Sequence, residues 1–183
     1  ILDIIYMEKF KKPRNLEVLA VNDPEEIDTW GEDLHENLPQ IGGFGGGSLT
    51  LLIGAVKTGK STLISNLFLN PEFYGQEQFD YVKIMSNTIS NDITSRFLKE
   101  AFDVSDYYDD SIISGVVDNQ KKFEKKDQPK IAIIADDLLG SVPRNGLLWS
   151  LCSRYRHYNI RMLLISSQNY RQVSPIARQN CQN

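Results

Sequence analysis

Cysteine and histidine are scarce in this chain of 183 residues. The two cysteines, Cys152 and Cys181, form no C-x-x-C pair, and the two histidines, His35 and His157, are far apart in the sequence. A structural zinc site or a disulfide framework needs more of these residues at closer spacing. The shortage therefore argues against both and suits a reducing compartment.

Long apolar runs, low-complexity tracts and internal repeats are also lacking. No stretch approaches the roughly 18 continuous apolar residues that a membrane-spanning helix requires, and no secretory signal is visible. Positive charge is in deficit, because 20 Lys and Arg face 24 Asp and Glu for a net charge of −4. The domain as a whole cannot act as a polycation on nucleic acid, so any DNA contact must be local.

What is present fits one globular core preceded by a leader. Residues 1–47 form the expected leader, with a short helix at Ile27–Leu34 and a glycine-rich hinge before the core at 48–183. Apolar periodicity predicts strands at 48–53, 81–85, 111–113, 131–135 and 162–166. Helices are predicted at 61–70, 92–102, 115–126 and 145–156. This alternation predicts an α/β fold with a mainly parallel central sheet flanked by helices.

Residues 54–61 read GAVKTGKS, which fits the phosphate-binding pattern G-x-x-x-x-G-K-[ST], or Walker A, between an apolar strand and a helix start. Gly54 and Gly59 permit the tight backbone path, Lys60 reaches the β- and γ-phosphates, and Ser61 offers a hydroxyl to Mg²⁺. The expected nucleotide-binding residues are Gly54, Ala55, Val56, Lys57, Thr58, Gly59, Lys60, Ser61 and Thr62. For Thr62, a plain helical role is an equal alternative.

Residues 131–137 form an apolar strand that ends in two carboxylates, which is a Walker B pattern. Asp136 is expected to hold Mg²⁺, and Asp137 to orient or deprotonate the attacking water. The alternative is that the two acids only cap the strand or the next helix. Asp137 and Gly140 also fit the D-x-x-G of GTP-binding switch proteins, but no N-K-x-D guanine motif occurs in the chain.

Gln168 follows the strand predicted at 162–166, where its amide would position the attacking water if this strand lies beside that of the P-loop. Ser166 or Asn169 would substitute in another register, and a plain polar loop is the alternative. Hydrolysis also needs positive charge on the transferring phosphoryl, often from an arginine of a neighbouring subunit. The chosen candidates are Arg178 and Arg156, although surface arginines such as Arg154 usually only solvate a helix.

A basic cluster follows the helix predicted at 115–126. Its members are Lys121, Lys122, Lys125, Lys126 and Lys130. DNA contact is one interpretation, and cations that complement a helix C-terminus are the favoured alternative.

These motifs together resemble the genome-packaging ATPases of poxviruses and giant viruses, within the FtsK–HerA superfamily. Beside the two phosphate motifs, the resemblance depends on three segments: Ser153–His157, Ser166–Gln168 and Pro175–Asn180. It covers roughly residues 38–180. It departs from much of the wider superfamily at Asp137, where Glu is common, and the family continues past Asn183.

The resemblance implies a RecA-like P-loop NTPase fold of the ASCE type, with ATP and Mg²⁺ as cofactors. It also implies a homo-oligomeric ring, pentameric or hexameric, that threads double-stranded DNA into a capsid, with capsid or membrane proteins as further partners. Gln168 would be the sensor and Arg178 an interface arginine. The implied location is the host-cell cytoplasm, the viral factory or the virion.

Two other functions fit the same residues. A conjugation or secretion ATPase of this superfamily would share every motif and differ in substrate. A nucleotide-gated binding module would hold ATP without useful turnover.

Overall fold

The computed structural model describes residues 38–39, 41, 46–75, 78–90, 95–138 and 140–182. The helix predicted at Ile27–Leu34 and most of the predicted leader lie outside them, so those expectations stay predictions. The described core is an α/β structure with a five-stranded sheet in the order β1-β5-β4-β2-β3. Every neighbouring pair of these strands is parallel, as the sequence pattern predicted.

The strands are β1 (Ser48–Ile53), β2 (Tyr81–Ser86), β3 (Asp103–Ser105), β4 (Ile131–Asp136) and β5 (Ile160–Ser167). The α-helices are α2 (Lys60–Leu69), α3 (Arg96–Ala101), α4 (Asp110–Gln120), α5 (Leu147–Leu151) and α6 (Pro175–Asn180). The described residues also form the short 3₁₀ helices η2 (Lys125–Asp127), η3 (Tyr155–Tyr158) and η4 (Tyr170–Gln172).

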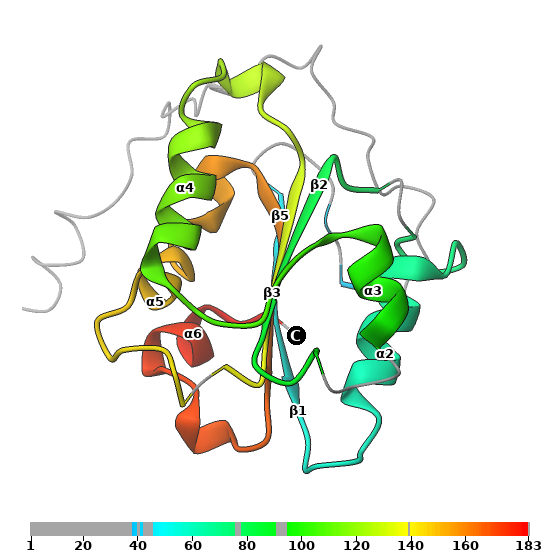
Figure 1. Cartoon of the computed structure of the whole chain (residues 1–183). Helices are drawn as coiled ribbons and strands as arrows, with labels where there is room; N and C mark the ends of the chain where they lie inside the picture. Colours follow the sequence, from blue (N-terminus) through cyan, green and yellow to red (C-terminus); the bar gives the residue numbers. More distant parts are fainter. Residues whose placement is uncertain are drawn as a thin grey trace, which may run out of the picture.

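Helices cover both faces of the sheet. Figure 1 shows α4, α5 and α6 on one side and α2 and α3 on the other. The first face packs Ile133 and Ile165 against Trp149 of α5, and the second packs Ile134 and Leu164 against Phe68 of α2. Strands β4 and β5 are buried along their whole length, which explains their nearly continuous apolar sequences.

The strand predicted at 111–113 is wrong, because these residues form the first turn of α4. Asp109 caps this helix, with its side chain accepting a hydrogen bond from the Ser111 amide at 2.7 Å. Ile113, Val116 and Gln120 are its buried residues, and their three- and four-residue spacing is helical. The helix predicted at 115–126 therefore begins earlier and ends at Gln120.

The other predicted elements are found close to their expected places. Strands β1, β2, β4 and β5 contain the four remaining predicted ranges, and α2 begins one residue before the predicted helix start. The helix predicted at 92–102 is found as the shorter α3, and the one predicted at 145–156 is divided into α5 and η3.

The strand that the sequence pattern missed is β3, at the sheet edge. It pairs with β2 so that Asp103 lies opposite Lys83, and the two side chains form an ion pair of 2.8 Å between Nζ and Oδ1. Burial raises the pKa of Asp103, but hydrogen bonds from Lys83 and Tyr81 outweigh it and lower the pKa overall. This contact satisfies the charge of Lys83, which is only 7% exposed.

Candidate functional site

The loop between β1 and α2 folds back on itself. The hydroxyl of Thr58 donates to the Ala55 carbonyl at 2.8 Å, and a Cβ added at Gly54 would lie 2.5 Å from the Thr58 Oγ1. Gly59 has a φ of +89°, which L residues with a side chain rarely adopt. Both glycines are thus required by the backbone path.

Lys60 lies inside this loop at the first position of α2. Its side chain is buried, and its ammonium donates to the carbonyls of Gly54 at 2.9 Å and Ala55 at 3.2 Å. An ammonium has three protons, so one remains for a further acceptor. A positive charge is therefore held at the centre of the loop with capacity for one more oxygen.

The N-terminus of α2 carries no anion from its own cap or first turn. Gly59, as its N-cap, provides no side-chain hydrogen bond, and no acidic residue lies in the first turn. The first amides of a helix lack partners inside it, and the helix dipole favours negative charge there. Ser61 is partly exposed and Thr62 exposed in this turn.

Asp136 is the last residue of β4 and is 7% exposed. Its Oδ2 accepts a hydrogen bond from the Ser86 hydroxyl at 3.1 Å, whereas its buried Oδ1 has no hydrogen-bond partner among the described residues. Burial raises the pKa of this carboxyl, and the charge of Asp137 adds to the rise; the Ser166 and Ser86 hydroxyls and Lys60 only oppose it. A buried carboxylate oxygen without a partner is a suitable ligand for a hard cation.

Asp137 has a φ of +48°, in the left-handed region that aspartate tolerates better than most residues. Its Oδ2 accepts a hydrogen bond from the Gln168 side-chain amide at 3.3 Å. A polar cavity of about 150 Å³ lies here, lined by Asp137, Gly140, Ser167, Gln168 and Gln172. Asp137 and Gln168 thus share a space large enough for ordered water.

The strand order explains how these residues meet. The order of the strands places β5 between β1 and β4. Three features therefore meet at the carboxyl ends of these strands: the loop after β1, Gln168 after β5, and the acid pair Asp136 and Asp137 at the end of β4. Successive β5 carbonyls join the three: Ser167 accepts the Gly54 amide at 3.0 Å, and Ser166 accepts the Asp137 amide at 3.2 Å. The structure therefore brings together Lys60, Asp136, Asp137 and Gln168.

The two alternatives to Gln168, Ser166 and Asn169, do not line the polar cavity. Ser166 is fully buried, and the Asn169 side chain accepts the Arg171 amide at 2.9 Å as the cap of η4. Gln168 is exposed and points to Asp137, so of the three residues considered from the sequence it is the one that reaches the polar cavity.

The two candidate arginines lie in different places. Arg178 of α6 has its guanidinium carbon 5.0 Å from the Tyr170 ring centroid, and Tyr170 follows Gln168 by two residues. Arg156 lies in η3 before β5, where its Nε donates to the Tyr155 hydroxyl at 3.1 Å. The length of β5 separates Arg156 from Gln168 by roughly 25 Å, so Arg156 is not brought to the site of its own chain.

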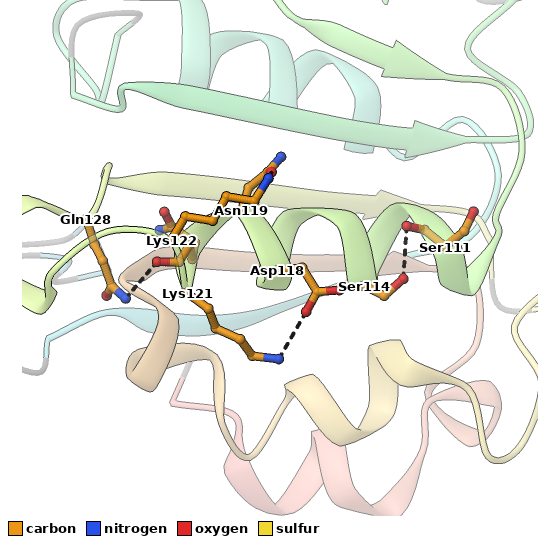
Figure 2. Close-up of polar contacts among 8 residues, drawn as sticks. Ser111, Ser114, Asp118, Asn119, Lys121, Lys122 and Gln128 are labelled. Atoms are coloured by element: carbon orange, nitrogen blue, oxygen red, sulfur yellow. Dashed lines mark hydrogen bonds and ion pairs between the residues drawn. The ribbon is translucent and has the colours of Figure 1, made fainter.

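The lysine cluster is engaged mainly within its own segment, and Figure 2 shows two of its members, Lys121 and Lys122, at the end of α4. Lys121 pairs with Asp118 at 3.0 Å, Lys122 donates to the Asn119 side chain at 2.8 Å, and Lys126 lies 3.6 Å from Glu124. The first two contacts lie at the end of α4, whose last turn itself contains no basic residue, and the third lies at η2. Both interpretations of the cluster therefore stay predictions.

Ser86 is the site residue that sequence reasoning missed. It ends β2, pairs in register with Asp136 and is fully buried. The adjoining Asn87 donates to the Ser141 hydroxyl at 2.8 Å, which connects the end of β2 to the segment after the acid pair. The only sequence signal was the polar run of residues 86–88 after an apolar strand.

The sequence matches no protein-family model and has no significant similarity to a curated protein. Across the part of the chain that the structure describes, no helix combines the length and apolarity needed to cross a membrane. The same residues contain no cluster of three His, Cys, Asp or Glu side chains arranged to hold a metal.

Proposed function

We propose that this chain is a P-loop ATPase of RecA-like, ASCE type, which binds ATP with Mg²⁺ at the carboxyl edge of its sheet and hydrolyses it. The observation that carries the proposal is that the 54–59 loop, Gln168 and the Asp136–Asp137 pair meet at the carboxyl ends of three adjacent strands. Each residue type suits its place, because phosphoryl transfer requires positioning and charge neutralisation more than covalent chemistry.

The phosphates are assigned to the loop and the start of α2. The free amides of this helix turn and the remaining proton of Lys60 supply donors for phosphate oxygens. The residues fit Mg²⁺, since Asp136 has an unpartnered buried oxygen and Ser61 offers a hydroxyl. Mg²⁺ commonly binds through one or two protein ligands plus phosphates and water, and it would neutralise charge on the phosphates.

Asp137 and Gln168 are assigned to the attacking water. The Gln168 amide holds the Asp137 Oδ2 at 3.3 Å, which leaves the other carboxylate oxygen to accept a proton from water. Gln168 also has an amide oxygen that can bind the same water. Arg178, beside Tyr170, is the proposed interface arginine, and Arg156 could act only on a neighbouring subunit.

The proposed cellular task is translocation of double-stranded DNA into a viral capsid by a ring of identical subunits in the host cytoplasm or viral factory. It depends on the sequence resemblance in Ser153–His157, Ser166–Gln168 and Pro175–Asn180. Because most of the cluster's lysines have local partners, a duplex contact at this helix end would have to compete with those pairs.

The test measures phosphate release from ATP and Mg²⁺, with and without long double-stranded DNA. We expect turnover that DNA stimulates, and that Lys60→Ala abolishes. Asp137→Asn should retain ATP binding and lose hydrolysis by at least about 100-fold, whereas the exposed control Asp127→Asn should behave as the unaltered protein.

Three results would each contradict a different part of the proposal. Turnover indifferent to DNA would remove the translocase assignment and leave the ATPase. ATP binding without turnover would favour a nucleotide-gated module. Absence of ATP binding would overturn the whole proposal.

A further inference from the structure

The end of β2 holds a buried hydroxyl against the proposed metal ligand. Ser86 has no exposed surface, and its Oγ lies 3.1 Å from the Asp136 Oδ2. The two residues are opposite each other in the parallel β2–β4 register, so their side chains point to the same face of the sheet. Their contact is therefore fixed by the pairing of two core strands.

The proton of Ser86 has a defined direction. A serine hydroxyl has one proton, while an ionised carboxylate can only accept, so Ser86 donates to Asp136. Ser86 Oγ also lies 3.2 Å from the Thr88 hydroxyl and accepts the Thr88 amide at 3.4 Å. Thr88 can thus donate to Ser86 while Ser86 donates to Asp136, which orients the serine hydroxyl.

The hydrogen bond fixes one carboxylate oxygen and leaves the other available. Asp136 Oδ2 is occupied by Ser86, and Oδ1 is buried without a partner among the residues described. A carboxylate free to rotate about its Cβ–Cγ bond would exchange the two oxygens. With Ser86 present, Oδ2 is held and Oδ1 is the oxygen left for a cation. Ser166, which lies opposite Asp136 on β5, also acts on this carboxyl and opposes the rise of its pKa.

We infer that Ser86 is a positioning residue, which orients the Asp136 carboxylate for a divalent cation that accompanies the nucleotide. The inference rests on the proposed function. Partners that hold a metal-ligating carboxylate commonly change metal affinity by roughly 10- to 100-fold when removed. Ser86 therefore affects the affinity for Mg²⁺ rather than that for the nucleotide itself.

The experiment titrates Mg²⁺ at a fixed concentration of mant-ATP and follows binding by fluorescence, with a parallel titration of phosphate release. Ser86→Ala should raise the Mg²⁺ midpoint by roughly 10- to 100-fold in both. Binding of mant-ATP in EDTA should stay close to that of the unaltered protein. Ser86→Thr, which keeps the hydroxyl, should restore the midpoint.

Ser48→Ala is the matched control, because Ser48 is also a buried strand serine but lies at the amino end of β1. If both variants shift the midpoint equally, Ser86 is merely structural and the inference is wrong. If Ser86→Ala does not fold, Ser86→Cys keeps the shape with a weak donor and should shift the midpoint in the same direction.

Failure of this inference can be told from failure of the proposed function. If the unaltered protein binds mant-ATP with Mg²⁺ and the serine variants leave the midpoint unchanged, only the role of Ser86 is overturned. If the unaltered protein does not bind mant-ATP at all, both are overturned.

Discussion

Asp136 combines deep burial with a carboxylate oxygen that the described residues leave unpartnered. Ionisation in this position has a free-energy cost, which appears as a pKa above the ordinary value of 3.8, mainly because of burial. The folded protein therefore favours the protonated carboxyl more than the unfolded chain does. A cation beside Oδ1 would reverse this preference.

The pH dependence of stability should reveal this cost. A raised folded-state pKa means that the contribution of Asp136 is fully present below pH 3.8 and is lost as pH rises through the folded pKa. We expect the Tm difference between Asp136→Asn and the unaltered protein, without metal, to become more positive from acid pH to neutrality. Thermal unfolding monitored by circular dichroism at several pH values measures it.

Ser48→Ala, which changes no ionisable group, is the control and should give a difference that does not vary in this way. A constant difference for Asp136→Asn across the pH range would show that the charge of Asp136 is not costly in the folded protein.

At the scale of the element, α4 contains a glycine that the fold does not require. Gly115 is exposed in the middle of this helix, and a Cβ there would meet no atom within 4 Å. Gly115→Ala should therefore raise the free energy of unfolding by about 0.5–1 kcal/mol, since glycine has the larger conformational freedom to lose.

Gly75 provides the opposite case. Its φ is +64°, and a Cβ would lie 3.4 Å from the Pro71 Cα, so Gly75→Ala should lower the free energy of unfolding by about 1 kcal/mol or more. Urea denaturation of both variants measures the two effects. If both substitutions changed the free energy of unfolding in the same direction, the backbone conformation described for Gly115 or for Gly75 would be wrong.

The elements that the sequence predicted are those with a strong pattern of their own. Strand β4 is an uninterrupted apolar run up to Asp136, and α2 begins after a glycine loop and ends at Leu69, with Asn70 as its C-cap before a proline. The misplaced strand at 111–113 arose from two adjacent isoleucines read without the Asp109 cap. Strand β3 has the short sequence DVS, and its pairing with β2 through Asp103 is a tertiary contact that no local pattern encodes.

The site residues also differ in how far the sequence alone could predict them. Lys60 and the Asp136–Asp137 pair lie in motifs whose spacing reflects local backbone geometry, so the sequence was sufficient to propose them. Gln168 depended on a guess about strand order, and its contact with Asp137 became visible only with β5 between β1 and β4. Ser86 is 50 residues from Asp136 in sequence, and only the sheet register brings them together.

For the whole molecule, ligand binding should add to stability. Because the proposed site is formed by the ends of three core strands, Mg²⁺ and ATP would bind the folded chain and not the unfolded one. At a ligand concentration of about 100 times the Kd, binding adds about 2.7 kcal/mol to the free energy of unfolding. For a chain of this length, each kcal/mol raises Tm by about 2–4 °C. Differential scanning fluorimetry with ATP and Mg²⁺ measures the shift.

Lys60→Ala should abolish this shift, and Gly115→Ala should keep it. A shift of equal size with GTP would point to a site that does not discriminate the base, and no shift with either nucleotide would contradict the assignment of the loop.

The two carbonyls at the end of β5 have a mechanical consequence. Ser166 is bonded to the acid pair and Ser167 to the start of the loop, while the segment that follows runs through η4 to α6 on one face of the sheet (Figure 1). A change in position on either side of the pocket would therefore reach the end of the same central strand. From there the chain continues to α6, which carries Arg178.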